Sequence, residues 1–466
     1  MKILQVSASD GGGGAHKIAS ALHDGFRARG HTSAMAVGTR TSGDPDVHEI
    51  PLGISETRVF LNRVAGGVVR RVSRRVRSLR PLRRAMKAAH PFAYFRALDA
   101  GREFFDYPGS RRILDLPGFM PDIVHLHNLH HAYFDLRTLP ALSGRVPVAL
   151  TLHDEWTYTG HCAYTMGIER WRTGCVSCPD LEVHPAIRRD ATHENWLVKK
   201  AIYERSRLYV SAPSNWLLER ARESILARGA ADFRLIRNGI DQAVFRPGDQ
   251  SAARDVLGLP RDRLVLLFAA NLLGKNPFKD YDTVAAAVEQ VAVALRDRQL
   301  LLIALGGEGE VTRLGNAELR FVPYESEPER VAAYYQAADL YLHAANADTF
   351  PTTILEALSV GRPVIATAVG GIPEQLRSLA AAPGSWTGAA AGPETATGVL
   401  VAAHDAAGMA AAAAALLADD ELRARLGRNA AEDAAKRFRL DAQLDATLAW
   451  YAEAIRDWGG WRRAAA

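Results

Sequence analysis

The chain has 466 residues and a formal net charge of +5, with 48% hydrophobic and 23% charged residues. It is too long for one compact core, so we expect two domains, and its ordinary globular composition excludes a disordered or fibrous chain. No apolar run is long enough to span a bilayer, the chain starts with a strand-like segment rather than a signal peptide, and three cysteines make no disulfide framework. We therefore expect a cytoplasmic protein.

Short apolar segments alternate with helical ones through the first half of the chain. Apolar residues recur at helical spacing between residues 15 and 29 and predict a first helix there. Strands that alternate with helices are typical of a parallel sheet covered on both faces. The expected strands cover residues 3–7, 33–37, 123–126, 146–152 and 208–212.

A strongly basic segment lies after the first strands. No acidic residue occurs between residues 57 and 98, whereas residues 63–87 carry nine arginines and one lysine. Apolar residues from Val68 to Leu79 predict a helix that Pro81 should end. Such a helix suits an anionic membrane surface or lipid head group; the alternative is a solvated helix that packs on its own domain. Nucleic acid is not expected, because no recognition motif accompanies the arginines.

The same alternation restarts near Asn238, where we place the domain boundary. The alanine-rich stretch from residue 402 onward predicts successive helices, the last over residues 440–458. Further strands are expected over residues 264–269, 300–304, 319–322, 340–343 and 364–367. We therefore expect an α/β protein with two doubly wound domains that face a central cleft, because ligands bind at the carboxyl ends of such strands.

A glycine-rich loop from Asp10 to His16 follows the first expected strand and opens the first helix. Glycines let backbone N–H groups approach a ligand, and a helix N-terminus favours an anion. His16 stands where a dinucleotide fingerprint has its last glycine, and the next strand ends at Gly38 without a carboxylate, so a nicotinamide site is disfavoured. No Gly-Lys-Ser/Thr follows, which argues against a P-loop. A simple tight turn is the alternative.

Two carboxylates eight positions apart flank a loop-to-helix junction in the second half. Asp348 lies just beyond the strand expected at residues 340–343, and Glu356 lies about one turn into a helix that begins near Pro351. A helix start of this kind leaves N–H groups available for a phosphate. The two acids could hold the hydroxyls of a sugar and of a ribose; alternatively, one favours a helix dipole and the other is exposed.

The segment DTFPTTILEALSVGRPVIATAVGGIPE resembles the ExxxxxxxE region of the family 4 glycosyltransferases, which have the two-domain GT-B fold. The combination of TLHD-W, TG-C and GC-xx-CP is similar to the exopolysaccharide and colanic-acid type bacterial members. Other similar segments are DIVHLHNLHHAYFDLRTL, IRNGIDQAVFRP, LLIALGGEG and RVAAYYQAADLYLHAA. The resemblance therefore extends over both halves of the chain and implies an enzyme.

The resemblance also implies roles for residues of the second half. Glu356 matches the acid that binds the ribose hydroxyls, and Asp348 matches the acid that contacts the transferred sugar, here aspartate instead of glutamate. Lys279 matches the lysine that neutralises the diphosphate. The backbone N–H groups that meet the diphosphate match Thr352, Thr353, Ile354 and Leu355.

One family feature is missing beside Lys279. Asn271 occupies the place of the neighbouring arginine, and Phe278 stands directly before the lysine. Less positive charge is therefore expected beside the diphosphate than in the family. Lys275 is a candidate substitute for the missing arginine.

In the first half, His153 matches the active-site histidine near the sugar, although a histidine at a strand end could also simply bind a backbone carbonyl. Gly12 and Gly13 match the loop that faces the diphosphate and the acceptor. His127 and Asn128 are expected to contact the acceptor. The histidines at positions 125, 127, 130 and 131 suggest a metal cluster at first sight, but positions 125 and 127 alternate along a strand and the implied fold needs no metal.

Cys162, Cys175 and Cys178 have the spacing C-x12-C-x2-C. The last pair has the spacing of a zinc knuckle, and His161 could complete four ligands. In the relatives this loop often carries a further cysteine, where Ile168 stands here. A structural zinc therefore competes with buried thiols or a disulfide.

These observations predict a retaining glycosyltransferase that uses a nucleoside-diphosphate sugar and no cofactor or catalytic metal, in bacterial polysaccharide or glycolipid synthesis. Residues 1–237 would bind the acceptor, lipid-linked or a free sugar, and residues 238–440 the donor. Residues 441–466 would form a helix that packs back toward the first domain. An anionic membrane surface is expected to contact residues 63–87. The alternatives are a sugar-nucleotide epimerase and a non-catalytic nucleotide-sugar-binding subunit.

Overall fold

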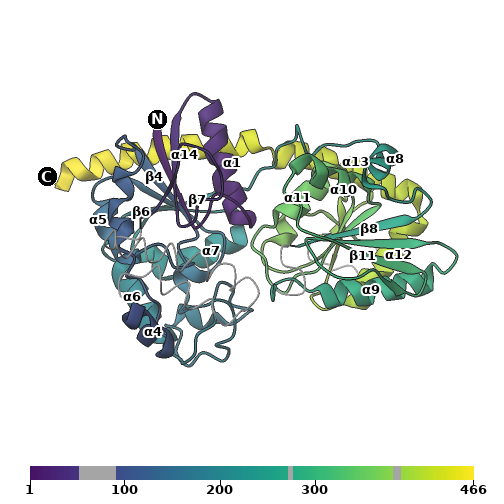
Figure 1. The fold of residues 1–466 in the computed structure, drawn as a ribbon, viewed down its shortest axis with the longest axis horizontal. Helices are drawn as coiled ribbons and strands as arrows, with labels where there is room; N and C mark the ends of the chain where they lie inside the picture. The colour runs from purple at the N-terminus through teal and green to yellow at the C-terminus, as the bar shows by residue number, and fades with distance from the viewer. Residues whose placement is uncertain (52–90, 271–275, 381–389, 466) are drawn as a thin grey trace. The chain divides into compact units, whose positions relative to one another are not determined.

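The computed structural model describes residues 1–51, 91–270, 276–380 and 390–465 (Figure 1). The predicted basic helix within residues 63–87, Asn271 and Lys275 lie outside the described residues. The chain divides into two compact units. The first comprises Met1–Pro213, Leu217–Ile236 and Ala446–Ala466, and the second comprises Ser214–Trp216 and Arg237–Asp445.

The first unit is built on a seven-stranded parallel sheet with the order β3-β2-β1-β4-β5-β6-β7. Its central strands are fully buried, as expected for a parallel sheet with helices on both faces. The strands are β1 (Lys2–Ser7), β2 (Thr32–Val37), β3 (Val47–Glu49), β4 (Ile123–His127), β5 (Val148–Thr151), β6 (Leu208–Ala212) and β7 (Ala230–Leu235). The helices are α1 (Gly14–Ala28), α4 (Pro91–Asp99), α5 (Leu139–Ser143), α6 (Thr192–Tyr203) and α7 (Asn215–Glu223).

The second unit contains a nine-stranded sheet with the order β10-β11-β9-β8-β12-β13-β16-β14-β15, in which only the β10–β11 pair is antiparallel among the described strands. The strands are β8 (Leu264–Ala269), β9 (Leu300–Leu305), β10 (Thr312–Leu314), β11 (Ala317–Val322), β12 (Leu340–His343), β13 (Val364–Thr367), β14 (Ser378–Leu379), β15 (Ala390–Ala391) and β16 (Gly398–Val401). The helices are α8 (Gln250–Leu257), α9 (Tyr281–Ala294), α10 (Pro328–Ala337), α11 (Thr352–Ser359), α12 (Ala406–Ala418) and α13 (Asp420–Arg437).

The apolar residues of β8 explain why this sheet is covered on both faces. Val265 and Leu267 belong to one buried cluster, whereas Leu266 and Phe268 belong to another. Successive side chains of a strand point to opposite faces, so a continuous apolar run buries both faces at once.

The last helix, α14 (Leu440–Ala465), is shared by the two units, because its residues from Ala446 onward cluster with the first unit. There the Tyr451 hydroxyl accepts a hydrogen bond from the Gln5 side chain at 3.2 Å, and the Trp450 indole donates to Asp232 at 3.1 Å. The chain thus leaves the first unit after Ile236 and returns to it within α14. None of the helices in the described ranges combines the length and apolarity needed to cross a bilayer.

Candidate functional site

Both sheets have a point at which the strand order reverses, and the candidate residues gather at these points. In the first unit the reversal lies between β1 and β4, and in the second it lies between β8 and β12. Loops that leave neighbouring strands in opposite directions at such a point open a crevice at the carboxyl ends of the strands. The Gly12 and Gly13 loop follows β1, Asn128 follows β4, and Asp348 follows β12.

Lys279, His343 and Asp348 form a compact cluster at the carboxyl end of β12. A short antiparallel pairing of Lys279 with Ala345 holds the lysine segment against the chain that leaves β12. The Lys279 ammonium donates to Asp348 Oδ2 at 2.5 Å and to His343 Nε2 at 3.2 Å. The lysine and aspartate side chains are only 14% and 13% exposed, so the pair lies in a largely desolvated place.

The cluster fixes the protonation of its members. Burial alone would raise the pKa of Asp348, but the adjacent Lys279 ammonium and His343 hold that pKa well below its ordinary value. Burial and Lys279 lower the pKa of His343 to about 4, so this ring is neutral at neutral pH. Because Lys279 can only donate, His343 accepts at Nε2 and carries its proton on Nδ1, where the Tyr341 hydroxyl lies at 3.1 Å.

Helix α11 begins directly after this cluster, with Pro351 at its N-cap and no side chain as a cap. Proline has no N–H group, so the amides of Thr352, Thr353 and Ile354 are those without an intrahelical partner at this end. In a regular helix the amide of Leu355 is the first to donate to a carbonyl oxygen of the helix itself. It therefore differs from the amides of the other three predicted residues, which have no such partner. The free amides and the helix dipole together favour an anion.

Glu356 lies one turn into α11 and is 5% exposed. Its Oε2 accepts a hydrogen bond from the Tyr335 hydroxyl at 2.8 Å. Burial, and next the neighbouring carboxylate, raise the pKa of Tyr335 well above its ordinary value, so the tyrosine stays a donor. The hydrogen bond fixes the orientation of the carboxyl group of Glu356, a preorganisation that the sequence pattern did not reveal.

A glycine pair supports the loop that carries Asp348. The Gly371 amide donates to the Asp348 carbonyl oxygen at 3.2 Å. A Cβ atom at Gly370 would lie 1.9 Å from the same oxygen, and one at Gly371 would lie 1.9 Å from the carbonyl oxygen of Thr349. Gly370 also has a positive φ of 55°. The pair is visible in the sequence, but only the fold shows which backbone it approaches.

In the first unit, the glycine loop after β1 is held by a carboxylate. Asp10 accepts hydrogen bonds from the amides of Thr41 and Ser42 at 2.7 and 2.8 Å. Gly12 has a φ of 106°, a conformation that favours glycine, and Gly13 is the N-cap of α1 without a side-chain cap. The loop therefore presents backbone N–H groups at a helix start, as the sequence predicts, and the ligand that it meets stays a prediction.

His153 follows β5 and is linked to a buried row of polar groups. Its Nε2 lies 2.9 Å from His127 Nδ1, and His127 Nε2 lies 2.8 Å from Gln5 Oε1. Burial lowers the pKa of His153 to about 4 and the pKa of His127 well below its ordinary value, so both rings are neutral. Since the Gln5 oxygen can only accept, His127 donates from Nε2, accepts at Nδ1 from His153, and leaves His153 with its lone pair on Nδ1.

The row continues to α14 through Gln5. The Gln5 amide donates to the Tyr451 hydroxyl, which lies 2.5 Å from His125 Nδ1. His125 Nε2 in turn lies 2.6 Å from the Thr151 hydroxyl. A helix from the far end of the sequence therefore helps to fix the tautomer of the histidines.

The position of His127 corrects one expectation. Its side chain is fully buried, and both ring nitrogens are engaged inside the protein. It therefore cannot contact an acceptor directly and acts instead behind His153. Asn128 is partly exposed and has a φ of 39°, and its predicted contact with the acceptor stays a prediction.

The three cysteines, for which zinc, buried thiols and a disulfide were the alternatives, line one pocket together with His161. None of them is in a disulfide. Among the described residues, two groups bring three or more potential metal-ligand atoms within 4.8 Å of one another, and neither includes a cysteine. Burial raises the pKa of Cys162 to about 12 and that of Cys175 to about 11, which keeps these thiols protonated. The structure therefore shows three free thiols, of which Cys175 is buried and Cys162 and Cys178 are partly buried.

Comparison with known sequences finds relatives that match part of this chain. Residues 249–433 match the family model described as "Glycosyl transferases group 1". The putative colanic acid biosynthesis glycosyl transferase WcaC of Escherichia coli is 28% identical over 259 residues, which cover 53% of this chain and 60% of that protein. A D-inositol 3-phosphate glycosyltransferase of Catenulispora acidiphila is 34% identical over 256 residues, covering 51% and 55%. The chain thus spans little more than half the length of these relatives.

Solved structures match nearly the whole chain. Sucrose-phosphate synthase from Thermosynechococcus elongatus has a TM-score of 0.61 at 19% identity and covers 98% of this chain and 100% of its own. Anabaena HepE, solved in complex with UDP, has a TM-score of 0.59 at 16% identity and covers 97% and 100%. These identities show the fold alone, and that fold is the predicted GT-B architecture.

Proposed function

We propose that this chain, whose residues 249–433 match the group 1 glycosyl transferases and whose fold is GT-B, moves a sugar from a nucleoside-diphosphate donor to a hydroxyl acceptor. The proposal includes retention of the anomeric configuration and membership of family 4. The observation that carries it is the cluster of Lys279, Asp348 and His343 beside the N-terminus of α11, within the matched region.

The donor would be held by the second unit. Its diphosphate would accept hydrogen bonds from the amides of Thr352, Thr353 and Ile354, and Glu356 would bind the ribose hydroxyls. The charge of Lys279 is compensated by Asp348. A bound diphosphate would therefore share the lysine with this aspartate, whose remaining oxygen would contact the transferred sugar.

In the transfer step, the bond between the anomeric carbon and the diphosphate oxygen breaks while the acceptor oxygen bonds to the same carbon. Negative charge gathers on the departing diphosphate, and the acceptor hydroxyl gives up its proton to it. Lys279 and the α11 amides would stabilise this charge without Mg²⁺ or Mn²⁺. No described side chain near Asp348 stands out as a nucleophile, which agrees with attack on the face that the leaving group departs from.

His153 would orient the sugar, and His127, which holds the His153 ring from behind, would be a positioning residue. His127→Asn removes the ring that accepts from His153 and should lower kcat at least tenfold while the KM for the donor stays within about threefold. His153→Ala should lower kcat at least as strongly. A kcat unchanged in His127→Asn would refute the positioning role.

The acceptor and pathway rest on weaker support. The relative named for colanic acid biosynthesis favours polysaccharide or glycolipid assembly, with a lipid-linked or free sugar acceptor. We extend the proposal to a cytoplasmic protein that associates peripherally with an anionic membrane through residues 63–87. Replacing Arg70, Arg71, Arg74 and Arg75 by glutamine should abolish co-sedimentation with anionic liposomes, and unchanged co-sedimentation would refute this part.

The test of the main proposal is a product assay with a panel of nucleotide-sugars, beginning with UDP-glucose, because a structural neighbour is described in complex with it. We expect release of nucleoside diphosphate that depends on an acceptor. NMR of the product should show the same anomeric configuration as in the donor. Transfer should be lost in Asp348→Ala and Glu356→Ala. Isomerised donor without acceptor would favour the epimerase alternative, and tight nucleotide binding without turnover would favour the non-catalytic one. Transfer unchanged in both variants would refute the site.

A further inference from the structure

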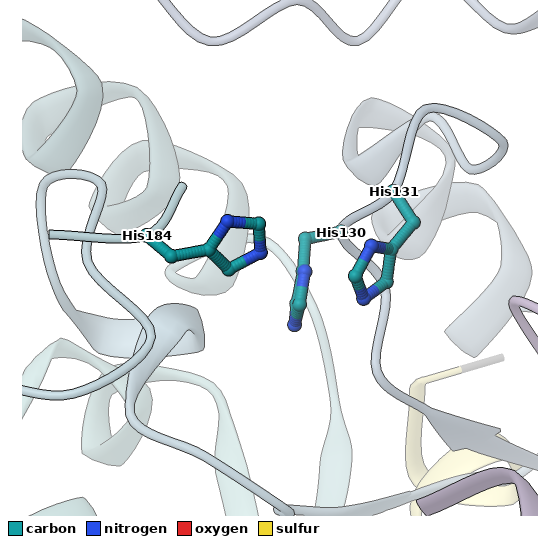
Figure 2. Close-up of side chains that lie close together, drawn as sticks. All are labelled: His130, His131 and His184. Atoms are coloured by element: carbon teal, nitrogen blue, oxygen red, sulfur yellow. The ribbon is translucent and has the colours of Figure 1, made fainter. Parts of the chain in front are cut away.

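Three histidines from two separate loops of the first unit converge outside the residues assigned to transfer (Figure 2). His130 and His131 lie in the loop after β4, and His184 lies in the loop that precedes α6. One ring nitrogen from each comes within 4.8 Å of the others. The ring centroids of His130 and His131 are 3.9 Å apart, and His184 faces this pair at 6.3 and 6.2 Å (Figure 2).

His130 has the surroundings of a metal ligand. It is only 8% exposed, and its Nε2 lies 2.7 Å from the Asp154 carboxylate. Since a carboxylate accepts, Nε2 carries a proton, and in the neutral ring the lone pair lies on Nδ1. This buried Nδ1 has no hydrogen-bond partner among the described residues. A carboxylate that holds the second nitrogen of a histidine is the usual support of a metal-binding imidazole, because it fixes the tautomer and raises ligand basicity.

The backbone at His131 and Ala132 is in an unfavourable conformation. His131 has a φ of 88° and the following Ala132 a φ of 61°, both in the left-handed region that L-residues rarely adopt. Such conformations are unfavourable and persist only where other contacts impose them. A cation between the rings would pair with the His130 lone pair, and its binding free energy would offset the strain of the neighbouring backbone.

We propose that His130, His131 and His184 bind a transition-metal ion, and that this ion is Zn²⁺ under physiological conditions. Imidazole suits zinc, and three histidines leave one position of a tetrahedral ion for water. Ligand nitrogens of a tetrahedral zinc lie roughly 3.4 Å apart for bonds of about 2.0–2.1 Å, so side-chain rotations would bring the three nitrogens, which lie within 4.8 Å of one another, around the ion. The ion would join the loop after β4 to the loop before α6. This inference does not depend on the proposed transfer reaction.

The test is metal binding by the full chain after removal of metal with a chelator. Titration with Co²⁺ should give one saturable site with the intense visible bands of a tetrahedral ion and no thiolate charge-transfer band. His184→Ala and His131→Ala should each weaken Zn²⁺ binding at least tenfold in competition with a chromophoric chelator. Asp154→Asn should weaken it about 10–100-fold, as for other groups that support a ligand. His48→Ala, a histidine of β3 outside the cluster, is the matched control and should bind like the wild type.

Zn²⁺ should also raise the melting temperature of the wild type and of His48→Ala, but not that of His184→Ala. If His184→Ala fails to fold, the wild-type Co²⁺ spectrum decides between sites. A spectrum without thiolate bands supports the histidine site, whereas thiolate bands would overturn it by assigning the ion to the cysteines. No saturable binding by the wild type, or unchanged binding in both histidine variants, would equally overturn it.

Discussion

The ion pair of Lys279 and Asp348 can be tested by a double-mutant cycle with Lys279→Gln and Asp348→Asn. Both substitutions nearly preserve size and remove charge. Each single variant leaves the other partner in a largely desolvated place, because the two side chains are 14% and 13% exposed. The single variants should therefore be less stable than the wild type, whereas the double variant should lose little more than either single one.

The magnitude follows from the geometry. Unit charges about 4 Å apart attract by about 4 kcal/mol at an effective dielectric constant of about 20, and desolvation of both groups offsets part of this attraction. Hydrogen bonds to charged groups contribute about 1.5–3 kcal/mol net. Since the ammonium donates to Asp348 at 2.5 Å, we expect a coupling free energy of about 2 kcal/mol between the two positions.

The free energy of unfolding of the four proteins is measured by urea unfolding, monitored by circular dichroism. The coupling free energy is obtained from the four values. Additivity within about 0.5 kcal/mol is what independent residues show, and it would refute the pairing. The same variants connect the pair to transfer. Lys279→Gln should lower kcat by about 10²–10³, the usual loss when one preorganised donor to a developing negative charge is removed. A kcat within threefold of the wild type would refute the role of the lysine.

Three further predictions concern the second unit. Tyr335→Phe removes the donor to buried Glu356 and should weaken nucleotide binding about 5–100-fold by calorimetry, whereas Tyr334→Phe on the same helix should not; equal affinities would contradict the role of this hydrogen bond. Gly370→Ala should destabilise the protein by at least about 2 kcal/mol in urea unfolding, since its Cβ would lie 1.9 Å from the Asp348 carbonyl oxygen at a φ of 55°; wild-type stability would show that the loop can move. The pKa of Asp348 in the folded protein lies below the ordinary value of 3.8, so the stability that this carboxylate contributes is complete above pH 3.8 and is lost as the pH falls below it. The difference in free energy of unfolding between the wild type and Asp348→Asn should therefore become smaller on acidification. A difference that does not change with pH would contradict the charge pairing.

Much of the fold could be predicted from local pattern. The strands expected at residues 208–212, 264–269, 340–343 and 364–367 coincide with β6, β8, β12 and β13. All are apolar runs buried on both faces, which leave little freedom in where a strand begins and ends. The short edge strand β3 and β7, which is only partly buried, were missed because their sequences lack such runs. The C-terminal helix runs to Ala465, beyond residue 458, where its periodicity placed the end, and within the segment 441–466 expected to form a final helix.

The sequence by itself determined the two sheets, the glycine loop at the start of α1, and the positions of Asp348 and Glu356 around the start of α11. These are local features, fixed by periodicity and by the chemistry of helix ends. Only the tertiary structure decided that His127 lies buried behind His153, that the three cysteines are free thiols, and that His184 reaches His130. Such contacts depend on the order of the strands in the sheet and on the conformation of long loops. Neither can be read from the spacing of residues along the chain.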